Sequence, residues 1–294
     1  MLFSKIKRAR EINRTHGLST ALKAALAYVR DSIRNPVWSL FWNSRQESSQ
    51  LAKNLVSLQW SQDGYTLSND ACGWCLSDGT GTAHYFPTLR DHSRFKPSNY
   101  EDLRTSYYES ELCSLSSEDT VIDVGAYVGV STRLAANIAA EVYAVEPSPR
   151  AAECLKNNTY GYNNVTVVEQ AAWSEESSLD LQLGGEPSED SLLTPDVPGD
   201  GSVVTVEANT IAEIASDYGI ETIDFLKIEA EGAEPEVVDG IDGIKVRKLA
   251  VRGDAEREGE ETHQAVAKRL RDRGFEVTVD LAHKGNMVYA RQTD

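Results

Sequence analysis

Three short segments carry residues that could bind a small molecule and act on it. In TVIDVGAYVGVST, residues 120–132, β-forming residues lead into a turn between Gly125 and Gly129. In VYAVEPSP, residues 142–149, Glu146 follows another run of β-formers. In DFLKIEAEGAEPEV, residues 224–237, an acidic cluster follows an apolar run. Glycines and acids placed directly after strands are typical of ligand sites at the carboxyl edge of a parallel sheet.

The loop from Gly125 to Gly129 lets a ligand approach the backbone, because glycine has no Cβ. A dinucleotide-binding loop has a glycine where this chain has Tyr127, since pyrophosphate needs that space. The tyrosine favours a cofactor without phosphates, such as S-adenosylmethionine. Glu146 fits the same interpretation, because a carboxylate there accepts two hydrogen bonds from a ribose diol and repels a 2′-phosphate. The simpler alternative for Glu146 is a solvated acid at a strand end. Asp123 would orient the loop backbone or the amino group of the ligand.

The third segment places Glu229 and Glu231 where a buried strand ends. These carboxylates could bind the positive methionine end of the cofactor, hold the acceptor, or take its proton. A metal ion is an alternative, since hard cations prefer clustered oxygens. Glu234, with Pro235 after it, is expected only to begin the next helix, where an acid is favoured by the helix dipole.

Strand-like and helix-like segments alternate from residue 120 onward. Predicted strands cover 121–124, 142–145, 165–168, 223–228 and 249–251, and predicted helices cover 130–140, 151–158, 211–218 and 263–273. This alternation predicts an α/β fold with a Rossmann-like, mostly parallel sheet covered on both faces. Segments 275–279 and 287–290 predict an antiparallel C-terminal hairpin, and 177–183 with 202–206 an extra one. The acid-, Pro- and Gly-rich segment 184–201 is typical of a mobile loop.

The chain of 294 residues is predicted to have three parts. Residues 1–48 form a basic amphipathic helical arm, residues 49–118 a small β-rich or mixed cap, and residues 119–294 the cofactor-binding domain. In the arm, apolar residues recur at helical spacing from Leu18 to Ile33. That helix either packs on the protein or contacts a membrane surface through residues 1–42.

Charge is distributed unevenly along the chain. The net charge is −17, yet residues 1–36 carry eight Lys and Arg against Glu11 and Asp31. An acidic body repels phosphates, which argues against a nucleic-acid partner. Such acidity is also typical of halophilic cytoplasmic proteins. No secretion signal or long apolar run is visible, and four cysteines are too few for a disulfide scaffold, so a cytoplasmic location is expected.

Two weaker signals are set aside. Cys72 and Cys75 have the spacing of redox and zinc sites, but no second pair follows, which favours a structural role. The five histidines are scattered without ligand spacing. His84 or His92 could reach the cofactor cleft, although solvated surface positions are the simpler expectation.

Together the three segments resemble the FkbM-type methyltransferase family. VIDVGAYVG, VYAVEPSP and DFLKIEAEGAEPEVVDG match its usual forms D-x-G-A-x-x-G, a strand ending in E-P, and L-K-I-D-x-E-G-A-E. The resemblance covers residues 105–245 in order and spacing. It implies a class I S-adenosylmethionine-dependent fold that methylates hydroxyl oxygens of sugars and related natural products.

The resemblance also implies roles for residues at matching positions. The cofactor would be bound by Asp123, Gly125, Ala126, Tyr127, Gly129, Glu146, Pro147, Gln170 and Ala171. The reaction site would be lined by Lys227, Glu229 and Glu231, without a metal. Glu229 stands where the family has aspartate, one methylene shorter, which leaves its catalytic role open.

The sequence therefore predicts an S-adenosylmethionine-dependent O-methyltransferase acting on a hydroxyl of a sugar, glycan or glycolipid-type acceptor. The alternatives are a nucleotide-dependent oxidoreductase on a Rossmann fold and a non-catalytic binding protein that retains the fold. We expect the protein to be cytoplasmic, with peripheral contact to the inner face of the membrane through residues 1–42. Its oligomeric state stays open.

Overall fold

The structure is a computed structural model, and it describes residues 50–61, 63–70, 72–89, 91, 95, 107–195, 199–253, 256–257, 260–281 and 286–293. The chain divides into two compact units, Met1–Leu58 and Gln59–Asp294. Helix α3 (Gln50–Ser61) begins in the first unit, and the features below belong to the second. The predicted arm of residues 1–48 lies outside the described residues. The predicted three-part division stays a prediction.

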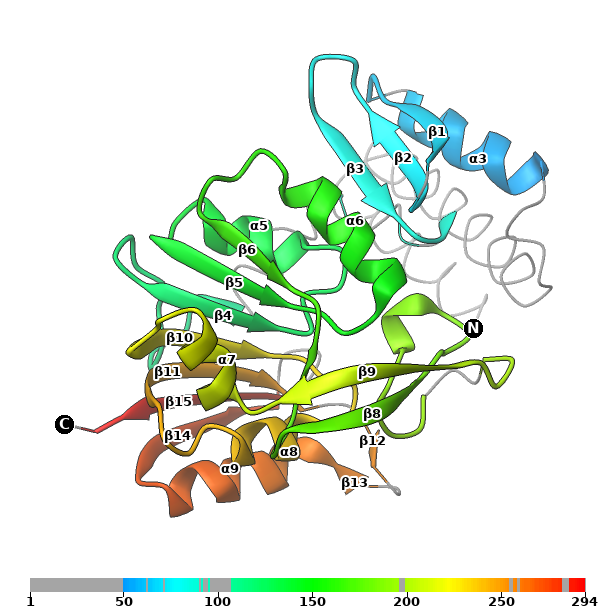
Figure 1. The fold of residues 1–294 in the computed structure, drawn as a ribbon. Helices are drawn as coiled ribbons and strands as arrows, with labels where there is room; N and C mark the ends of the chain where they lie inside the picture. The colour runs from blue at the N-terminus through cyan, green and yellow to red at the C-terminus, as the bar shows by residue number, and fades with distance from the viewer. Residues whose placement is uncertain are drawn as a thin grey trace, which may run out of the picture. The chain divides into compact units, whose positions relative to one another are not determined.

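A seven-stranded sheet forms the centre of the second unit (Figure 1). Its strands lie in the order β14-β15-β11-β10-β4-β5-β6. They are β4 (Thr120–Val124), β5 (Glu141–Val145), β6 (Val165–Val168), β10 (Thr222–Ile228), β11 (Lys245–Arg252), β14 (Phe275–Asp280) and β15 (Met287–Gln292). The strands from β6 to β11 are parallel, and β15 is antiparallel to both of its neighbours. This order, with the last two strands as an antiparallel hairpin, confirms the predicted fold class.

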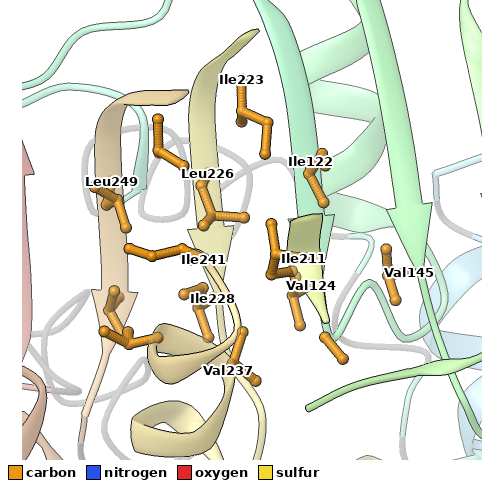
Figure 2. Close-up of a cluster of buried hydrophobic side chains, with 14 of the residues drawn as sticks. Ile122, Val124, Val145, Ile211, Ile223, Leu226, Ile228, Val237, Ile241 and Leu249 are labelled. Carbon is orange, nitrogen blue, oxygen red and sulfur yellow. The ribbon is translucent and has the colours of Figure 1, made fainter. Parts of the chain in front are cut away.

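Helices cover both faces of the sheet because each buried strand alternates its apolar side chains between them. On one face, Ile122 and Leu226 pack against α7 (Ile211–Asp217), α8 (Glu234–Asp239) and α9 (Thr262–Asp272), as Figure 2 shows in part. On the other face, Val121 and Phe225 share a core with α5 (Val130–Ala136), and α6 (Pro149–Thr159) packs beside it through Leu155. The sheet is thus enclosed between two helical layers.

The register of the parallel strands brings their carboxyl ends to one level. Val124 pairs with Val145 of β5 and with Ile228 of β10, and Ile228 pairs with Val251 of β11. The residues that follow these strands therefore lie side by side along one edge. The order of the strands reverses between β4 and β10, which is where open α/β sheets bind their ligands.

Two small sheets flank the central one. Strands β1 (Thr66–Asp70), β2 (Gly73–Ser77) and β3 (Ala83–Phe86) form an antiparallel sheet, called the β1–β3 sheet below. Strands β8 (Ser177–Gln182) and β9 (Val203–Asn209) form the long hairpin visible in Figure 1, joined on its β9 side by β7 (Ala171–Ala172). The predicted extra hairpin is therefore confirmed.

The sequence patterns did not predict the shortest strands. They are β7 and the pair β12 (Glu256–Arg257) and β13 (Glu260–Glu261). A two-residue strand cannot show an alternating pattern, so only its pairing partner identifies it. The helix predicted through Ala140 also ends earlier, at Ala136.

Candidate active site

The loop after β4 is held against the end of β10. Gly125 has φ 68°, and a Cβ there would lie 1.7 Å from the carbonyl oxygen of Glu229. Gly129 has φ 85° and begins α5, and a Cβ there would lie 2.6 Å from Leu155 Cδ1. At Gly125 the backbone contact excludes a side chain, whereas at Gly129 it is chiefly the positive φ that favours glycine. The loop between them curves over the carboxyl edge of the sheet.

Glu146, the first residue after β5, is fixed by two backbone amides. The Tyr127 N–H donates to Oε2 at 2.7 Å, and the Ser148 N–H donates to Oε1 at 2.9 Å. Tyr127 reaches this position with φ 51°, in the left-handed region. Burial raises the pKa of Glu146 to about 7, although the two amide hydrogen bonds oppose the rise. Each carboxylate oxygen accepts more than one hydrogen bond, so Glu146 can still bind a ribose diol.

A buried ion pair lies beneath the loop. The Lys227 ammonium is fully buried and lies 2.9 Å from Asp123 Oδ1. It also donates to the Gly125 carbonyl at 3.0 Å. Asp123 Oδ2 accepts from the hydroxyls of Ser131 and Thr132, at 3.0 and 2.6 Å. Burial alone would lower the pKa of Lys227, but the charges of Asp123 and Glu229 outweigh it and raise the pKa. Lys227 thus stays charged and holds the loop from below.

Glu229, the first residue after β10, bridges two cations. Its Oε1 lies 2.9 Å from an Arg252 nitrogen, and its Oε2 lies 3.5 Å from Lys227 Nζ. The buried phenol of Tyr107 lies beside Glu229 and Arg252, and burial followed by the Glu229 charge raises the pKa of that phenol. The Tyr107 ring also faces Lys227 Nζ at 5.3 Å. These two ion pairs fix the orientation of the Glu229 carboxylate.

Glu231 has a different environment from Glu229. Its backbone has φ 45°, and its carbonyl accepts from Ser191 Oγ at 2.9 Å. Burial, followed by the charges of Glu229 and Glu189, raises the pKa of Glu231 to about 9. The turn around it is closed by Glu234, whose Oε1 accepts from the amides of Ala230 and Gly232 at 2.9 and 3.2 Å. Glu234 also begins α8, as predicted.

A cavity of about 300 Å³ lies at the carboxyl edge of the sheet. Its charged lining is mostly acidic: Glu146, Glu189, Asp190, Glu229 and Glu231, with Arg252 as the one Lys or Arg of the described residues there. Gly125 and Tyr127 line it from the β4 loop, and Pro147 from the end of β5. Such a volume suits a small organic cofactor.

The charge of the cavity distinguishes S-adenosylmethionine from a dinucleotide as the cofactor. S-adenosylmethionine carries a sulfonium, an ammonium and one carboxylate group, a net positive charge, and no phosphate, so a lining in which acids outnumber the single arginine favours it even with Glu231 protonated. A dinucleotide would bring a doubly charged pyrophosphate against the same carboxyl groups. The residues present therefore fit S-adenosylmethionine, with Glu146 placed for the ribose and the loop from Gly125 to Tyr127 forming part of the cavity wall.

The structure does not bring all predicted site residues to the cavity wall. Gly125, Tyr127, Glu146, Pro147, Glu229 and Glu231 line it; Asp123, Ala126, Gly129, Lys227, Gln170 and Ala171 do not. Lys227 lies outside the cavity wall, because its ammonium is buried under the loop between Asp123 and backbone carbonyls. Gln170 instead accepts a hydrogen bond from Asn209 at 2.8 Å. Ala171 packs in the core of the β7–β9 sheet.

Sequence reasoning also missed part of the site. Arg252 directly follows the pairing of β11 with β10, so the strand-end rule that selected Glu229 could have selected it. The segment 187–192, expected only as part of a loop, lines the cavity with the 3-10 helix η2 (Pro187–Glu189) and Asp190. Asp190 is buried and pairs with Arg150 and with Ser148 Oγ. No periodicity in the sequence indicates that contact.

His84 is neither a surface residue nor a cavity residue. It is buried, its ring stacks on Tyr65 and Phe95, and its Nδ1 lies 2.9 Å from an Arg133 nitrogen. Burial and the Arg133 charge lower its pKa to about 4. His92 lies outside the described residues. Within the described ranges, no group of three or more His, Cys, Asp or Glu side chains could hold a metal ion, and no helix is long and apolar enough to cross a membrane.

Comparison with known proteins identifies the family of this chain. Residues 123–277, more than half of the chain, match the model of the methyltransferase FkbM domain. Methyltransferase sdnD of Sordaria araneosa is 26% identical over 235 residues, which is 66% of this chain and 89% of that protein.

Solved methyltransferase structures are also similar. A methyltransferase FkbM from Methylobacillus flagellatus KT is 18% identical with a TM-score of 0.45, covering 69% of this chain and 52% of that one, so this chain spans about half of its length. A SAM-dependent methyltransferase from Aquifex aeolicus is 19% identical with a TM-score of 0.38, covering 68% of this chain and 100% of that one. The chain belongs to the FkbM methyltransferase family and is an S-adenosylmethionine-dependent methyltransferase.

Proposed function

We propose that the protein transfers a methyl group to a hydroxyl of a sugar, glycan or glycolipid-type acceptor. The observation that supports this best is the cavity at the ends of β4, β5, β10 and β11. Glu146, which is fixed in position to bind a ribose, shares the wall of this cavity with the carboxyl groups of Glu229 and Glu231. Carboxyl groups are good partners for the hydroxyls of a sugar, because they accept hydrogen bonds from them. Membership of the FkbM family supports the same acceptor class.

When bound, S-adenosylmethionine would supply a methyl group on a positively charged sulfur. An acceptor oxygen can bond to that methyl carbon in line with the sulfur, which leaves as a neutral thioether. The contribution of the chain is chiefly alignment, which can supply much of the acceleration. Glu146 holds the ribose end, and Gly125 lets the loop pack against the Glu229 carbonyl at the edge of the cavity. Lys227 and Asp123 stabilise the loop from below, so they position the cofactor site without touching it.

Two carboxyl groups remain for the acceptor. The Glu229 carboxylate is oriented by Arg252 and Lys227, and its oxygens can accept a hydrogen bond from the acceptor hydroxyl. Glu231, with a pKa of about 9, holds its proton at neutral pH before a cofactor binds. A cationic cofactor nearby favours its ionised form, which could then take the hydroxyl proton. Glu231 is therefore our candidate for the general base.

Isothermal titration calorimetry tests the cofactor assignment directly. We expect S-adenosylmethionine and its demethylated product to bind, Glu146→Gln to weaken both, and NAD not to bind. Tight binding of NAD alone would favour the oxidoreductase alternative and contradict this proposal.

The acceptor class is tested in the host organism. We expect deletion of the gene to leave one glycan or glycolipid species lighter by one CH₂ group for each missing methyl, detected by mass spectrometry. A complemented strain should restore the mass, and one carrying Glu231→Gln should not. Cofactor binding without turnover on any acceptor in a glycan panel would favour the non-catalytic alternative.

We also propose that the protein is cytoplasmic, adapted to high salt, and able to contact the inner face of the membrane through residues 1–42. The basic amphipathic pattern of that segment supports the contact, since anionic lipids attract clustered Lys and Arg. Deletion of residues 1–42 should release the protein from anionic liposomes sedimented at the ionic strength of the host. Equal sedimentation of both forms would remove the membrane proposal and leave the enzymatic one unaffected.

A further inference from the structure

Two of the four cysteines meet across a contact between distant segments. Cys72 lies in the connection between β1 and β2, and Cys154 lies on α6, 82 residues later. The Cys154 thiol lies 3.4 Å from the carbonyl oxygen of Cys72. A hydrogen bond with the Cys72 side chain, followed by burial, raises the pKa of Cys154, so the two thiols are also in contact. All four cysteines are in the reduced form in the structure, and none of them takes part in a disulfide.

The position of Cys72 is fixed by the hairpin around it. Asp70 pairs with Gly73, so the connection between the strands has two residues. The Asn69 side chain donates to the Gly73 carbonyl at 2.5 Å. Gly73 has φ 134°, and a Cβ there would lie 2.6 Å from the Pro87 carbonyl oxygen. The chain can therefore shift little at this point, and Cys72 stays against α6.

Helix α6 is equally fixed on its side of the contact. Asn158, one turn after Cys154, donates to the Tyr85 carbonyl and accepts from the Tyr85 N–H, both at 2.7 Å. These bonds join α6 to the outer edge of β3. The β1–β3 sheet and α6 thus hold the two cysteines together from both sides.

We infer that Cys72 and Cys154 form a reversible disulfide under oxidation by hydroperoxides, which joins the β1–β3 sheet covalently to α6. Cys72 is half-buried and accessible to a small oxidant, whereas Cys154 is fully buried. The Cys72 thiolate attacks one oxygen of hydrogen peroxide, the O–O bond breaks, and a sulfenic acid and hydroxide form. The Cys154 sulfur then displaces the sulfenic oxygen as water. Two thiols are oxidised, and one peroxide is reduced to water.

The pairing differs from the one that the sequence favours. Cys72 and Cys75 have C-x-x-C spacing, but Cys75 lies within the extended strand β2 and pairs with both β1 and β3. Three residues of extended chain span roughly 8–10 Å, more than the about 7 Å that a disulfide allows between Cα atoms. The tertiary contact with Cys154 is therefore the productive one.

Peptide mapping of the full-length protein tests the inference. We expect hydrogen peroxide to leave two of the four thiols free, with a Cys72–Cys154 cross-linked peptide that dithiothreitol releases. Cys72→Ser should abolish the cross-link, and Cys75→Ser should preserve it. The urea midpoint of the oxidised wild type should rise and return on reduction, and that of Cys72→Ser should not change.

Two outcomes would overturn the inference. One is a Cys72–Cys75 cross-link in the oxidised wild type. The other is oxidation of Cys72 to its sulfinic acid without any cross-link. Both are read from the wild-type protein, so they decide the question even if a cysteine variant does not fold.

Discussion

At the scale of single residues, Gly125 makes the closest contact of the site. Because φ is 68° and a Cβ would lie 1.7 Å from the Glu229 carbonyl, Gly125→Ala must displace the loop from the end of β10. We expect a loss of about 3 kcal/mol in the free energy of unfolding and at least roughly tenfold weaker binding of S-adenosylmethionine. Urea titration and calorimetry measure the two effects.

Gly219 provides a matched control for that substitution. Its φ is 69°, almost the same as that of Gly125, but no atom lies within 4 Å of the Cβ position. Gly219→Ala therefore adds only the backbone strain, about 1 kcal/mol, and should leave cofactor affinity unchanged. If both variants bind the cofactor equally well, the contact between Gly125 and Glu229 does not shape the site.

The raised pKa of Glu231 predicts how the free energy of unfolding depends on pH. Burial, then Glu229 and Glu189, raises its folded pKa from 4.5 to about 9, and Arg252 opposes this. Between these pH values the folded chain keeps a proton that the unfolded chain has released. The free energy of unfolding should therefore fall as pH rises through this window. Glu146 contributes in the same direction only up to about pH 7.

The interval from about pH 7 to pH 9 consequently isolates Glu231 from Glu146. We expect urea titrations to show a smaller loss of stability across that interval for Glu231→Gln than for the wild type. Glu207→Gln, which changes an exposed glutamate on β9, should follow the wild type. Parallel curves for all three proteins would contradict the assignment.

At the scale of elements, Asn158 joins α6, β3 and the cofactor loop. Besides its two bonds to Tyr85, its side-chain N–H donates to the Val128 carbonyl at 2.8 Å. Asn158→Ala leaves three backbone groups without their partner in a buried region. We expect a loss of about 2–4 kcal/mol in the free energy of unfolding and weaker cofactor binding, because Val128 belongs to the loop.

The neighbouring Asn157 serves as the control for this contact. It is half-buried, and its side chain donates to the Glu153 carbonyl within its own helix in an exposed hydrogen bond, so Asn157→Ala should change stability by less than about 0.5 kcal/mol. Urea titration of both variants measures the difference. Equal effects would show that the contact of α6 with β3 is not anchored by Asn158.

At the scale of the whole molecule, the net charge of −17 predicts a strong dependence on salt. Repulsion among exposed carboxylates destabilises the folded chain, and raising KCl from about 0.1 M to 1 M shortens the screening length from roughly 10 Å to 3 Å. We expect the thermal midpoint to rise by roughly 5 °C.

A charge-reduced variant separates screening from other effects of salt. Glutamine at the exposed positions Glu175, Glu176, Glu207 and Glu221 removes four negative charges without altering the core. Its midpoint should rise less than that of the wild type over the same KCl range. An equal rise would attribute the salt effect to stronger apolar burial rather than to screening.

The sequence by itself determined the fold class and predicted six of the residues that line the cavity. Alternating strand and helix periods predict a parallel sheet, because each period depends only on neighbouring residues. A glycine or an acid directly after a strand must lie at the carboxyl edge of that sheet. This rule identified five residues that line the cavity: Gly125, Tyr127, Glu146, Glu229 and Glu231.

Only the tertiary structure decided which side chains face the cavity and which lie beneath it. Lys227 belongs to the same motif as Glu229, yet strand alternation and the Asp123 charge bury it under the loop. Arg252, the segment 187–192 and the Cys72–Cys154 contact come from parts of the chain far apart in sequence. Such contacts depend on how whole elements pack, and local residue patterns do not encode that packing.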